Sequence, residues 1–215
     1  MRDVVRERWL EFTEPLEGGV PCLYNDRRGL TTIAYGDLCN TPSEAAALDM
    51  VHPDGTPATA AEKIAAWHVV HDDKVAAVLG WRYAATLTKL RLTRASMTAL
   101  ALAKLDSNDR ILRGRLPAWE SYPGCAQMAL HSLAWACGAE AHFPKLFADV
   151  AAGDWSGAAV EIRMNEWTPE GVHNVGLVPR NKANRILMLN AAIVDTEEVD
   201  WTNDPTDVPT LDDPA

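Results

Sequence analysis

The residues best suited to chemistry lie in a short stretch near the amino end of the chain. Glu17, Asp26 and Thr32 follow one another with the spacing Glu-x8-Asp-x5-Thr. Acid–base hydrolysis of a glycosidic bond needs one protonated carboxyl group and a second carboxyl group that stays ionised. The two groups need different surroundings, so they should stand on different elements across a cleft. The pattern therefore favours acid–base hydrolysis, with no metal and no organic cofactor.

Glu17 follows a segment whose apolar residues recur at helical spacing, which predicts a helix from the amino end. We expect this helix to end near Thr13 or Glu14, because Pro15 clashes with the preceding turn of a helix. The carboxyl end of a helix disfavours a nearby carboxylate, and burial acts in the same direction. Both effects favour a protonated Glu17. Glu14 is a rival acid, but its spacing to Asp26 is wrong.

Asp26 and Thr32 fall in a predicted hairpin or three-stranded sheet. Residues 21–24 and 30–35 have strand-like composition, and Asp26-Arg27-Arg28-Gly29 is typical of a turn. The Thr32 hydroxyl would hold the attacking water beside Asp26. Each residue also has a plain alternative, since Asp is common in turns and Thr in strands.

The elements that must position this stretch are mostly helices. Thr59 and Glu62 form a capping-box pattern, and another helix is expected from about Thr93 to Leu105. Residues 125–137 are apolar nearly all round and end at Gly138, which predicts a central buried helix. Further helices are expected over 154–164 and 181–194. Residues 40–57 resemble a loop with a short helical turn at 43–48.

A sheet this small cannot stand alone and must pack on helices. The expected fold is therefore α+β and mainly α. A small β lobe at about 17–57 packs on a helical body formed by 1–16 and 58–194, with a cleft between them. Residues 1–194 would form the catalytic domain. Residues 195–215 would be an acidic, disordered tail.

The stretch resembles the phage-type lysozyme, or endolysin, family, whose signature is this Glu-Asp-Thr triad. Gly18, Tyr24, Gly29 and the run Thr32-Ile33-x-x-Gly36 fit the resemblance as well. A second stretch, Gly176-Leu177-Val178-x-Arg180, looks like the "GLVxRRxxE" run near the end of many endolysins. The resemblance covers most of residues 4–194 and is weakest over 40–115.

The resemblance implies a two-lobed lysozyme-like fold and a muramidase. Such enzymes hydrolyse the β-1,4 bond between N-acetylmuramic acid and N-acetylglucosamine in peptidoglycan, with inversion. Glu17 would be the general acid, and Asp26 and Thr32 would position water. Arg180 would sit near Glu17, where its charge opposes the effect of burial. Tyr35, Gly36 and Ser132 are further candidates for substrate binding or support of the site.

The sequence departs from the family pattern at several positions. Pro15 lies where relatives often continue a helix, Asp37 stands where a histidine is common, and Asn184 replaces the glutamate of the second motif. None of these changes removes a predicted catalytic group.

The charge is unevenly distributed. The chain has 215 residues and a net charge of -10, but residues 195–215 carry eight acids and no base. Residues 1–194 therefore hold 22 acids against 20 bases, which is near neutral. The tail explains most of the acidity, so the charge says little about the catalytic surface. We expect a monomer that binds peptidoglycan strands and no nucleic acid.

The amino end is charged and lacks the apolar stretch of a signal peptide, and no 18-residue apolar run predicts a membrane span. The protein would be made in the cytoplasm and act on the cell wall after delivery by a partner such as a holin or a secretion system.

Several other residues invite a functional interpretation but have a simpler one. Cys22 and Cys39 could pair, but reduced, buried thiols are favoured. His68 and His71 beside Asp72 and Asp73 are expected on a solvated helix face rather than at a metal. Trp135 and Trp167 are expected in the core rather than against sugar, and His131 is expected in the core or at the edge of the cleft.

Two other functions stay open. A lytic transglycosylase uses a lone Glu and needs no water-positioning Asp and Thr. A non-catalytic wall-binding or phage structural protein could keep the fold without the reaction. Retention of all three triad residues favours hydrolysis.

Overall fold

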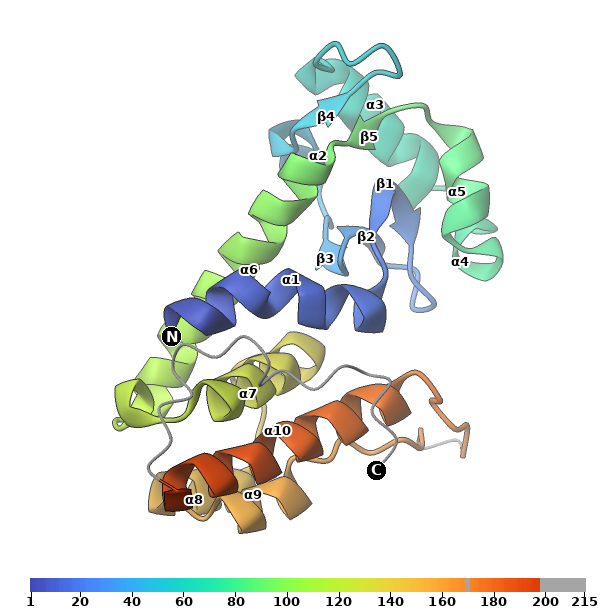
Figure 1. The fold of residues 1–215 in the computed structure, drawn as a ribbon. Helices are drawn as coiled ribbons and strands as arrows, with labels where there is room; N and C mark the ends of the chain where they lie inside the picture. Colours follow the sequence, from blue (N-terminus) through green and yellow to red (C-terminus); the bar gives the residue numbers. More distant parts are fainter. Residues whose placement is uncertain (169–170, 198–215) are drawn as a thin grey trace. The chain divides into compact units, whose positions relative to one another are not determined.

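The computed structural model describes residues 1–168 and 171–197, and it separates into two compact units. Unit 1 comprises Met1–Leu16 and the chain from Lys104 onward, and unit 2 comprises Glu17–Ala103. Helices α1 (Asp3–Glu17) and α6 (Arg94–Arg115) each contribute to both units. The described chain is mainly helical with small antiparallel sheets, as expected for a mainly α protein of the α+β class (Figure 1).

Unit 2 contains both small sheets. Strands β1 (Val20–Asn25), β2 (Thr31–Ala34) and β3 (Asp37–Leu38) form an antiparallel sheet in that order. Strands β4 (Met50–Val51) and β5 (Arg91–Leu92) form a second, two-stranded sheet. Four helices complete the unit: α2 (Pro42–Ala47), α3 (Ala60–His71), α4 (Ala76–Leu79) and α5 (Trp81–Leu87). The predicted hairpin is confirmed, with strands at nearly the expected residues.

Helices α2 and α3 begin at capping boxes. At α3 the Thr59 side chain accepts the backbone N–H of Glu62, whose carboxylate accepts the backbone N–H of Thr59. Thr41 and Glu44 form the same arrangement at α2. Each box satisfies two backbone donors that the first turn of a helix leaves free. The capping box predicted at Thr59 is confirmed, and the helical turn expected at 43–48 is α2.

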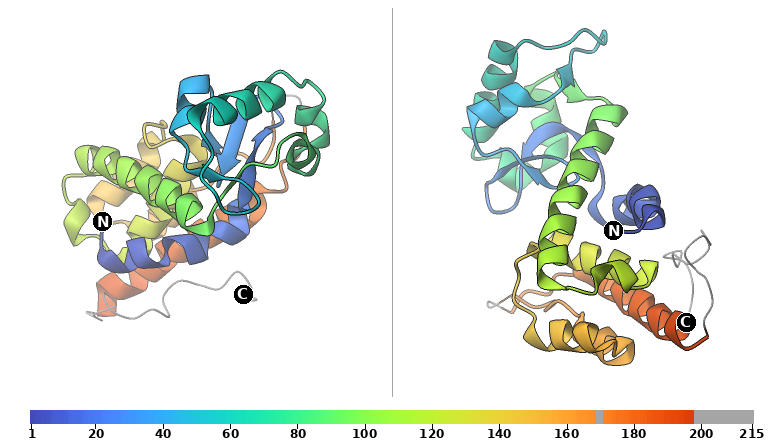
Figure 2. Two further views of the ribbon diagram at one scale, coloured as in Figure 1. Left: turned by 90° about the horizontal axis from the view of Figure 1, so that it is seen from above. Right: turned by 90° about the vertical axis from the view of Figure 1, so that its left-hand side faces the viewer.

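Unit 1 is built around α7 (Gly124–Cys137), as its apolar composition predicted. Of its fourteen residues, Cys125 to Trp135 are all buried. Helix α10 (Leu177–Glu197) packs along α7, and the two lie side by side in Figures 1 and 2. Helices α8 (Pro144–Ala152) and α9 (Trp155–Glu161) and the short 3-10 helix η1 (Trp119–Ser121) complete the unit. Rings of Trp9, Trp119 and Trp135 pack near its centre.

A buried polar cluster lies beside these rings. The Asp109 carboxylate accepts hydrogen bonds from Trp119 Nε1 at 2.9 Å and Arg113 Nε at 2.5 Å. It also lies 3.1 Å from the amino group of Met1 and 3.4 Å from His131 Nε2. His131 is fully buried, as expected, and its other ring nitrogen, Nδ1, makes no hydrogen bond.

Several element boundaries differ from expectation. Helix α1 continues past Pro15 to Glu17 rather than ending near Thr13 or Glu14. A proline in the last turn removes a single N–H donor, so the loss is small there. Helix α6 extends ten residues beyond Leu105, and α10 runs from Leu177 to Glu197 instead of 181–194. Helices α4, α5 and α8 and strands β4 and β5 were not predicted, and β4 falls within the loop that was expected at 40–57. The expectation for the tail beyond Glu197 lies outside the described residues.

All four cysteines are free thiols, and Cys22, Cys39 and Cys125 are buried. The interpretation of Cys22 and Cys39 as reduced, buried thiols is therefore confirmed. Within the described residues, no helix has the length and apolar character needed to cross a membrane.

Candidate functional site

Glu17 is the last residue of α1, at the point where the chain turns into the sheet of unit 2. Gly18, with φ of +66°, follows it in the left-handed region that commonly ends helices. The Glu17 carboxylate lies against the backbone at Gly36, since a Cβ added there would sit 3.7 Å from Oε2. Gly36 has φ of +85°, a conformation that other residues rarely adopt. This glycine therefore shapes the wall beside the predicted acid.

Asp26 organises the turn between β1 and β2. Its Oδ1 accepts the backbone N–H groups of Arg28 and Leu30, both at 2.8 Å. Its own backbone N–H donates to the Leu30 carbonyl at 2.9 Å, and Gly29 N–H donates to the Asp26 carbonyl. Gly29 has φ of +78°, as a three-residue hairpin loop with a glycine bulge requires. Asp26 therefore has the structural role of a turn residue, and both of these side-chain hydrogen bonds are accepted by Oδ1 and not by Oδ2.

Thr32 lies on β2 directly opposite Tyr24 on β1. Its hydroxyl donates to the Leu30 carbonyl at 3.0 Å, and only 3% of the residue is exposed. Side chains alternate between the faces of a strand, so Tyr24, Asp26 and Thr32 belong to one face of the hairpin. Diagonal neighbours on such a face have Cα atoms about 7–8 Å apart.

The electrostatic surroundings of Tyr24 include three acids. Burial, followed by the charges of Glu17, Asp26 and Asp37, raises the pKa of Tyr24 to about 12. The three carboxyl groups therefore come near one phenol, although they stand on α1, the hairpin turn and β3. Asp37 also accepts the backbone N–H of Tyr35 at Oδ2, at 3.3 Å.

Asp37 and Tyr24 were not chosen as site residues from the sequence. Asp37 was noted only as a departure from the family pattern, and Tyr24 only as a flanking match. Strand alternation places Tyr24 on the same face as Asp26 and could have identified it. Nothing local in the sequence signals that the charge of Asp37 acts on Tyr24.

The other face of the hairpin ties the site to α3. Asn25 Nδ2 donates to the Val70 carbonyl at 2.8 Å, and its Oδ1 accepts the Thr31 hydroxyl at 3.0 Å. Thr31 Oγ1 lies 2.9 Å from His71 Nδ1, and the His71 ring stacks on Trp67. His71 thus supports the hairpin. His68 is exposed, and its Nδ1 lies 3.4 Å from Asp72 Oδ2, so the prediction that His68 lies on a solvated helix face is confirmed.

The backbone between β2 and β3 is unusual. Ala34 has φ of +54°, and Gly36 follows it two residues later with a positive φ. A left-handed conformation at a residue with a Cβ costs roughly 1–2 kcal/mol. Tyr35 lies between them and is fully buried. Such strain often accompanies functional sites, and here it turns the chain at the residues that contact the Glu17 carboxylate.

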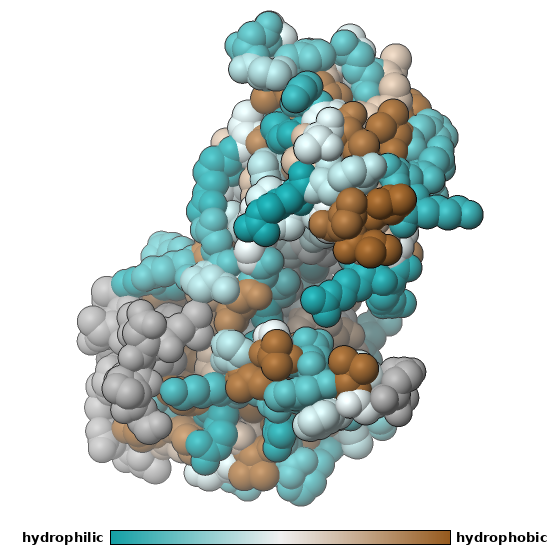
Figure 3. Space-filling view, turned by 90° about the vertical axis from the view of Figure 1, so that its right-hand side faces the viewer, coloured by the Kyte–Doolittle hydropathy of each residue, from teal (hydrophilic) through white to brown (hydrophobic). Residues whose placement is uncertain are grey.

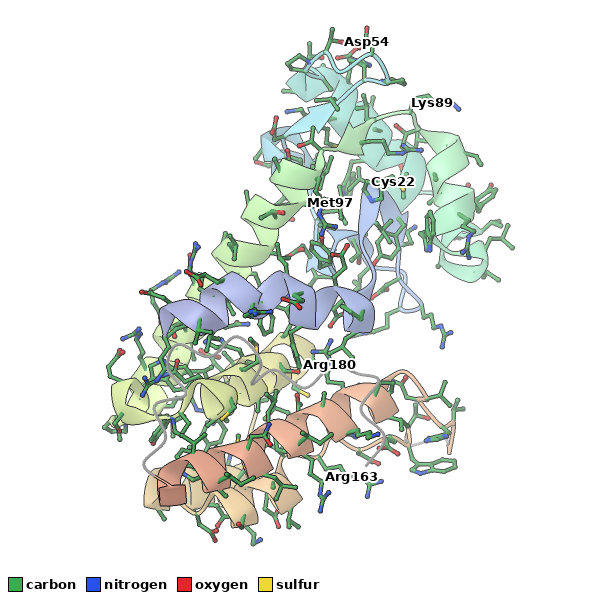
Figure 4. The ribbon with its side chains drawn as sticks, viewed as in Figure 1. Cys22, Asp54, Lys89, Met97, Arg163 and Arg180 are labelled. Carbon is green, nitrogen blue, oxygen red and sulfur yellow. The ribbon has the colours of Figure 1, made fainter. Side chains whose placement is uncertain are left out.

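The remaining predicted site residues, Arg180 and Ser132, lie in unit 1. Arg180 of α10 is 3% exposed and donates from Nη1 to the Ser132 hydroxyl at 3.0 Å and to its carbonyl at 3.2 Å (Figure 4). Asn184, one turn further along α10, is fully buried. Arg180 therefore links α10 to α7. Its predicted proximity to Glu17 stays a prediction.

Unit 1 also contains an open pocket of about 530 Å³ between α9 and α10. Its lining includes three cations, Arg163, Lys182 and Arg185, together with the acid Glu166. Glu166 already accepts hydrogen bonds from Asn181 and Arg163. None of the predicted site residues lines this pocket.

The two tryptophans expected in the core differ from each other. Trp135 is 6% exposed, as predicted. Trp167 is 53% exposed and stacks on His173 across an isolated bridge, so its assignment to the core was wrong. The segment around Trp167 lacks a regular helix or strand that would carry the ring into the core.

No family model, curated protein or solved structure matches the chain. The chemistry must therefore be argued from the site itself. Unit 2 brings together a helix-terminal glutamate, a fixed aspartate and a buried threonine hydroxyl. This set can supply a proton, accept a proton and orient a water molecule.

Proposed function

We propose that the protein is a lysozyme-type glycoside hydrolase that cleaves the glycan strands of bacterial peptidoglycan. The observation that supports this most strongly is that Glu17, Asp26 and Asp37, which stand on three separate elements, all add to the effect of burial in raising the pKa of Tyr24. Carboxyl groups on separate elements can hold different protonation states. Acid–base hydrolysis of a glycosidic bond has this requirement.

Glu17 is the proposed general acid. The carboxyl end of α1 carries partial negative charge, and this favours a protonated Glu17 that can donate to the leaving oxygen of the scissile bond. Gly36 leaves the space in front of Oε2 free of a side chain.

Asp26 and Thr32 are the proposed water-positioning pair. The Thr32 hydrogen is engaged by the Leu30 carbonyl, so its oxygen is left to accept a hydrogen bond from water. The unused Oδ2 of Asp26 can accept the second hydrogen of the same water. A water held at both hydrogens directs a lone pair at the anomeric carbon. Attack from that side, opposite the leaving group, inverts the configuration.

The substrate and the setting follow from the resemblance to endolysins. The proposed bond is the β-1,4 link between N-acetylmuramic acid and N-acetylglucosamine, and the proposed fold is lysozyme-like. Cleavage would take place in the cell wall after delivery by a holin or a secretion system. The proposed enzyme is a monomer that uses no cofactor, and Arg180 would act beside the acid.

One observation favours a lytic transglycosylase as the second candidate. Asp26 Oδ1 and the Thr32 hydroxyl both bond to the backbone of their own hairpin. Those bonds give each side chain a structural role that needs no substrate water. In a transglycosylase, the sugar's own hydroxyl replaces water and leaves an anhydro end.

Mass spectrometry of fragments released from purified sacculi separates these functions. Hydrolysis yields reducing ends, and we expect Thr32→Val to slow their release while thermal unfolding stays within a few degrees of wild type. Anhydro ends, with Thr32→Val unimpaired, would select the transglycosylase. No soluble fragments from folded wild-type protein would contradict both and favour a wall-binding protein.

A further inference from the structure

The pocket between α9 and α10 in unit 1 has no part in the proposed hydrolysis, since none of Glu17, Asp26 and Thr32 lines it. Its volume of about 530 Å³ lies in the range of small-molecule sites. Around the start of α10, Figure 3 shows apolar side chains in brown beside polar ones in teal. A hollow of this size and mixed character is suited to a small organic molecule.

Part of the pocket lining is apolar and open to water. Val160 of α9 and Val178 of α10 line the hollow, although they are 67% and 41% exposed. Ala159 and Ile162, which also line it, are buried and belong to the packed end of α9. A ligand with an apolar body would cover the two valines, and removing their surface from water favours binding.

The polar part of the lining consists mainly of cations from two elements. Arg163 follows the end of α9 and lines the pocket beside α10 (Figure 4), and Lys182 and Arg185 stand three residues apart on α10. Within the described residues, the Arg185 guanidinium has neither a hydrogen bond nor an ion pair. Arg163 makes one hydrogen bond there, from Nη2 to Glu166 at 3.5 Å. Both guanidinium groups therefore have N–H donors to offer a ligand.

The side-chain acceptors of the lining are already engaged. Asn181 Oδ1 accepts the Met164 N–H at 2.9 Å, and Glu166 Oε1 accepts Asn181 Nδ2 at 2.9 Å. Glu166 Oε2 lies 3.5 Å from both Arg163 and His173. The hydrogen bond from Asn181, with His173 and Arg163, lowers the pKa of Glu166, so it keeps its negative charge. Three cations and this one acid leave two positive charges and spare donors in the lining, so a ligand must supply the acceptors.

We propose that this pocket binds a small organic anion, in which a carboxylate or phosphate group is attached to an apolar body. The ionised oxygens accept N–H groups from Arg163 and Arg185, since a planar guanidinium can bond two such oxygens at once. The body covers Val160 and Val178. Charge alone would equally admit an inorganic ion, but the volume and the exposed valines select a larger ligand. The binding does not depend on the proposed hydrolysis.

Isothermal titration calorimetry on the full chain, in a buffer without phosphate, tests the proposal with four probes. Phenyl phosphate and phenylacetate carry the two kinds of ionised oxygen on an apolar ring. Inorganic phosphate lacks the ring, and benzyl alcohol lacks the charge. We expect at least one of the two aromatic anions to bind with a dissociation constant below about 1 mM, and the tighter one identifies the preferred group. Inorganic phosphate and benzyl alcohol should each bind at least about tenfold more weakly.

Substitutions in the lining have a matched control in the same unit. Arg185→Gln should weaken binding of the aromatic anion at least about tenfold, because hydrogen bonds to a charged group are lost. Val160→Ser should weaken it about fourfold, the equivalent of one buried methylene group. Arg110→Gln changes an exposed arginine of α6 outside the lining and should leave binding unchanged. Circular dichroism should show that all three variants remain folded, because the substituted side chains are exposed.

Three results would overturn the proposal. The first is no saturable binding of either aromatic anion to the wild-type chain. The second is an equal loss of binding in Arg185→Gln and Arg110→Gln, which would show a general effect of surface charge. The third is binding of inorganic phosphate or benzyl alcohol as tight as that of the aromatic anions, which would show a simple counter-ion site or a purely apolar one.

Discussion

Replacing Asp109 with Asn should destabilise unit 1 strongly, because the cluster around this carboxylate depends on its charge. The carboxylate accepts Trp119 Nε1 and Arg113 Nε, and its side chain is 11% exposed. Asn is nearly the same size but offers one acceptor and two donors. In either orientation of the amide, its NH2 faces Arg113 or the pair formed by Trp119 and the Met1 amino group.

The magnitude follows from burial. Removing one partner of a buried ion pair costs about 3–5 kcal/mol, and partial exposure of Arg113 places this change near the lower end. A loss of about 3 kcal/mol lowers the melting temperature by about 6–12 °C in a protein of this size. Asp106→Asn is the matched control on the same helix. Its ion pair with Arg6 is 46% exposed on both sides and contributes about 0–1 kcal/mol.

The pH dependence provides a second readout of Asp109. Burial alone would raise the pKa of this carboxyl, but hydrogen bonds from His131 and Arg113 and the Met1 ammonium together lower it below its ordinary value. A lowered folded pKa gives stability that is present above about pH 4 and is lost as the pH falls further. The gap between wild type and Asp109→Asn, measured by thermal denaturation, should therefore shrink below about pH 4. Equal melting of the Asp109 and Asp106 variants at neutral pH would refute this reasoning.

Three further outcomes are expected. Asn25→Leu should lower the free energy of unfolding in urea by about 1–3 kcal/mol, because the Val70 carbonyl loses its donor; an unchanged midpoint would contradict this bond. Gly36→Ala should lower the free energy of unfolding by roughly 1–2 kcal/mol, since φ is +85° there, and it should slow glycan cleavage. Unchanged thermal unfolding of this variant would show that residue 36 does not have a positive φ. Burial, opposed by Asp109, lowers the pKa of His131, so stability should fall as the pH drops below about 6.5. In His131→Gln the melting temperature should fall less steeply as the pH drops, and the same slope as in the wild type would contradict this role of His131.

Local chemistry made much of the fold predictable. The turn at Asp26 to Gly29 combines a side-chain acceptor with a glycine at the position that needs a positive φ, and both lie in adjacent residues. The capping box at Thr59 and the apolar helix ending at Gly138 are equally local. Each of these features depends on residues within a few positions of one another.

The misses have non-local or weak local causes. Pro15 is a helix breaker in the sequence, but its place in the last turn of α1 made it tolerable. Helix α4 has four residues and no capping side chain, so no periodic pattern could reveal it. Asp37 stands on β3, which pairs with β2 and not with β1, so the effect of its charge on Tyr24 depends on the assembled sheet and not on a short motif.

The proposed role of Glu17 can be tested by the rate at which soluble fragments are released from purified sacculi. Glu17→Gln removes the proton donor at nearly constant shape, and we expect a rate reduced by about 10²–10⁴-fold, the range of general acid catalysis. Glu14→Gln, three residues earlier on α1, makes the same chemical change and should retain wild-type activity. Equal rates for wild type and Glu17→Gln would contradict the assignment of Glu17 as the acid.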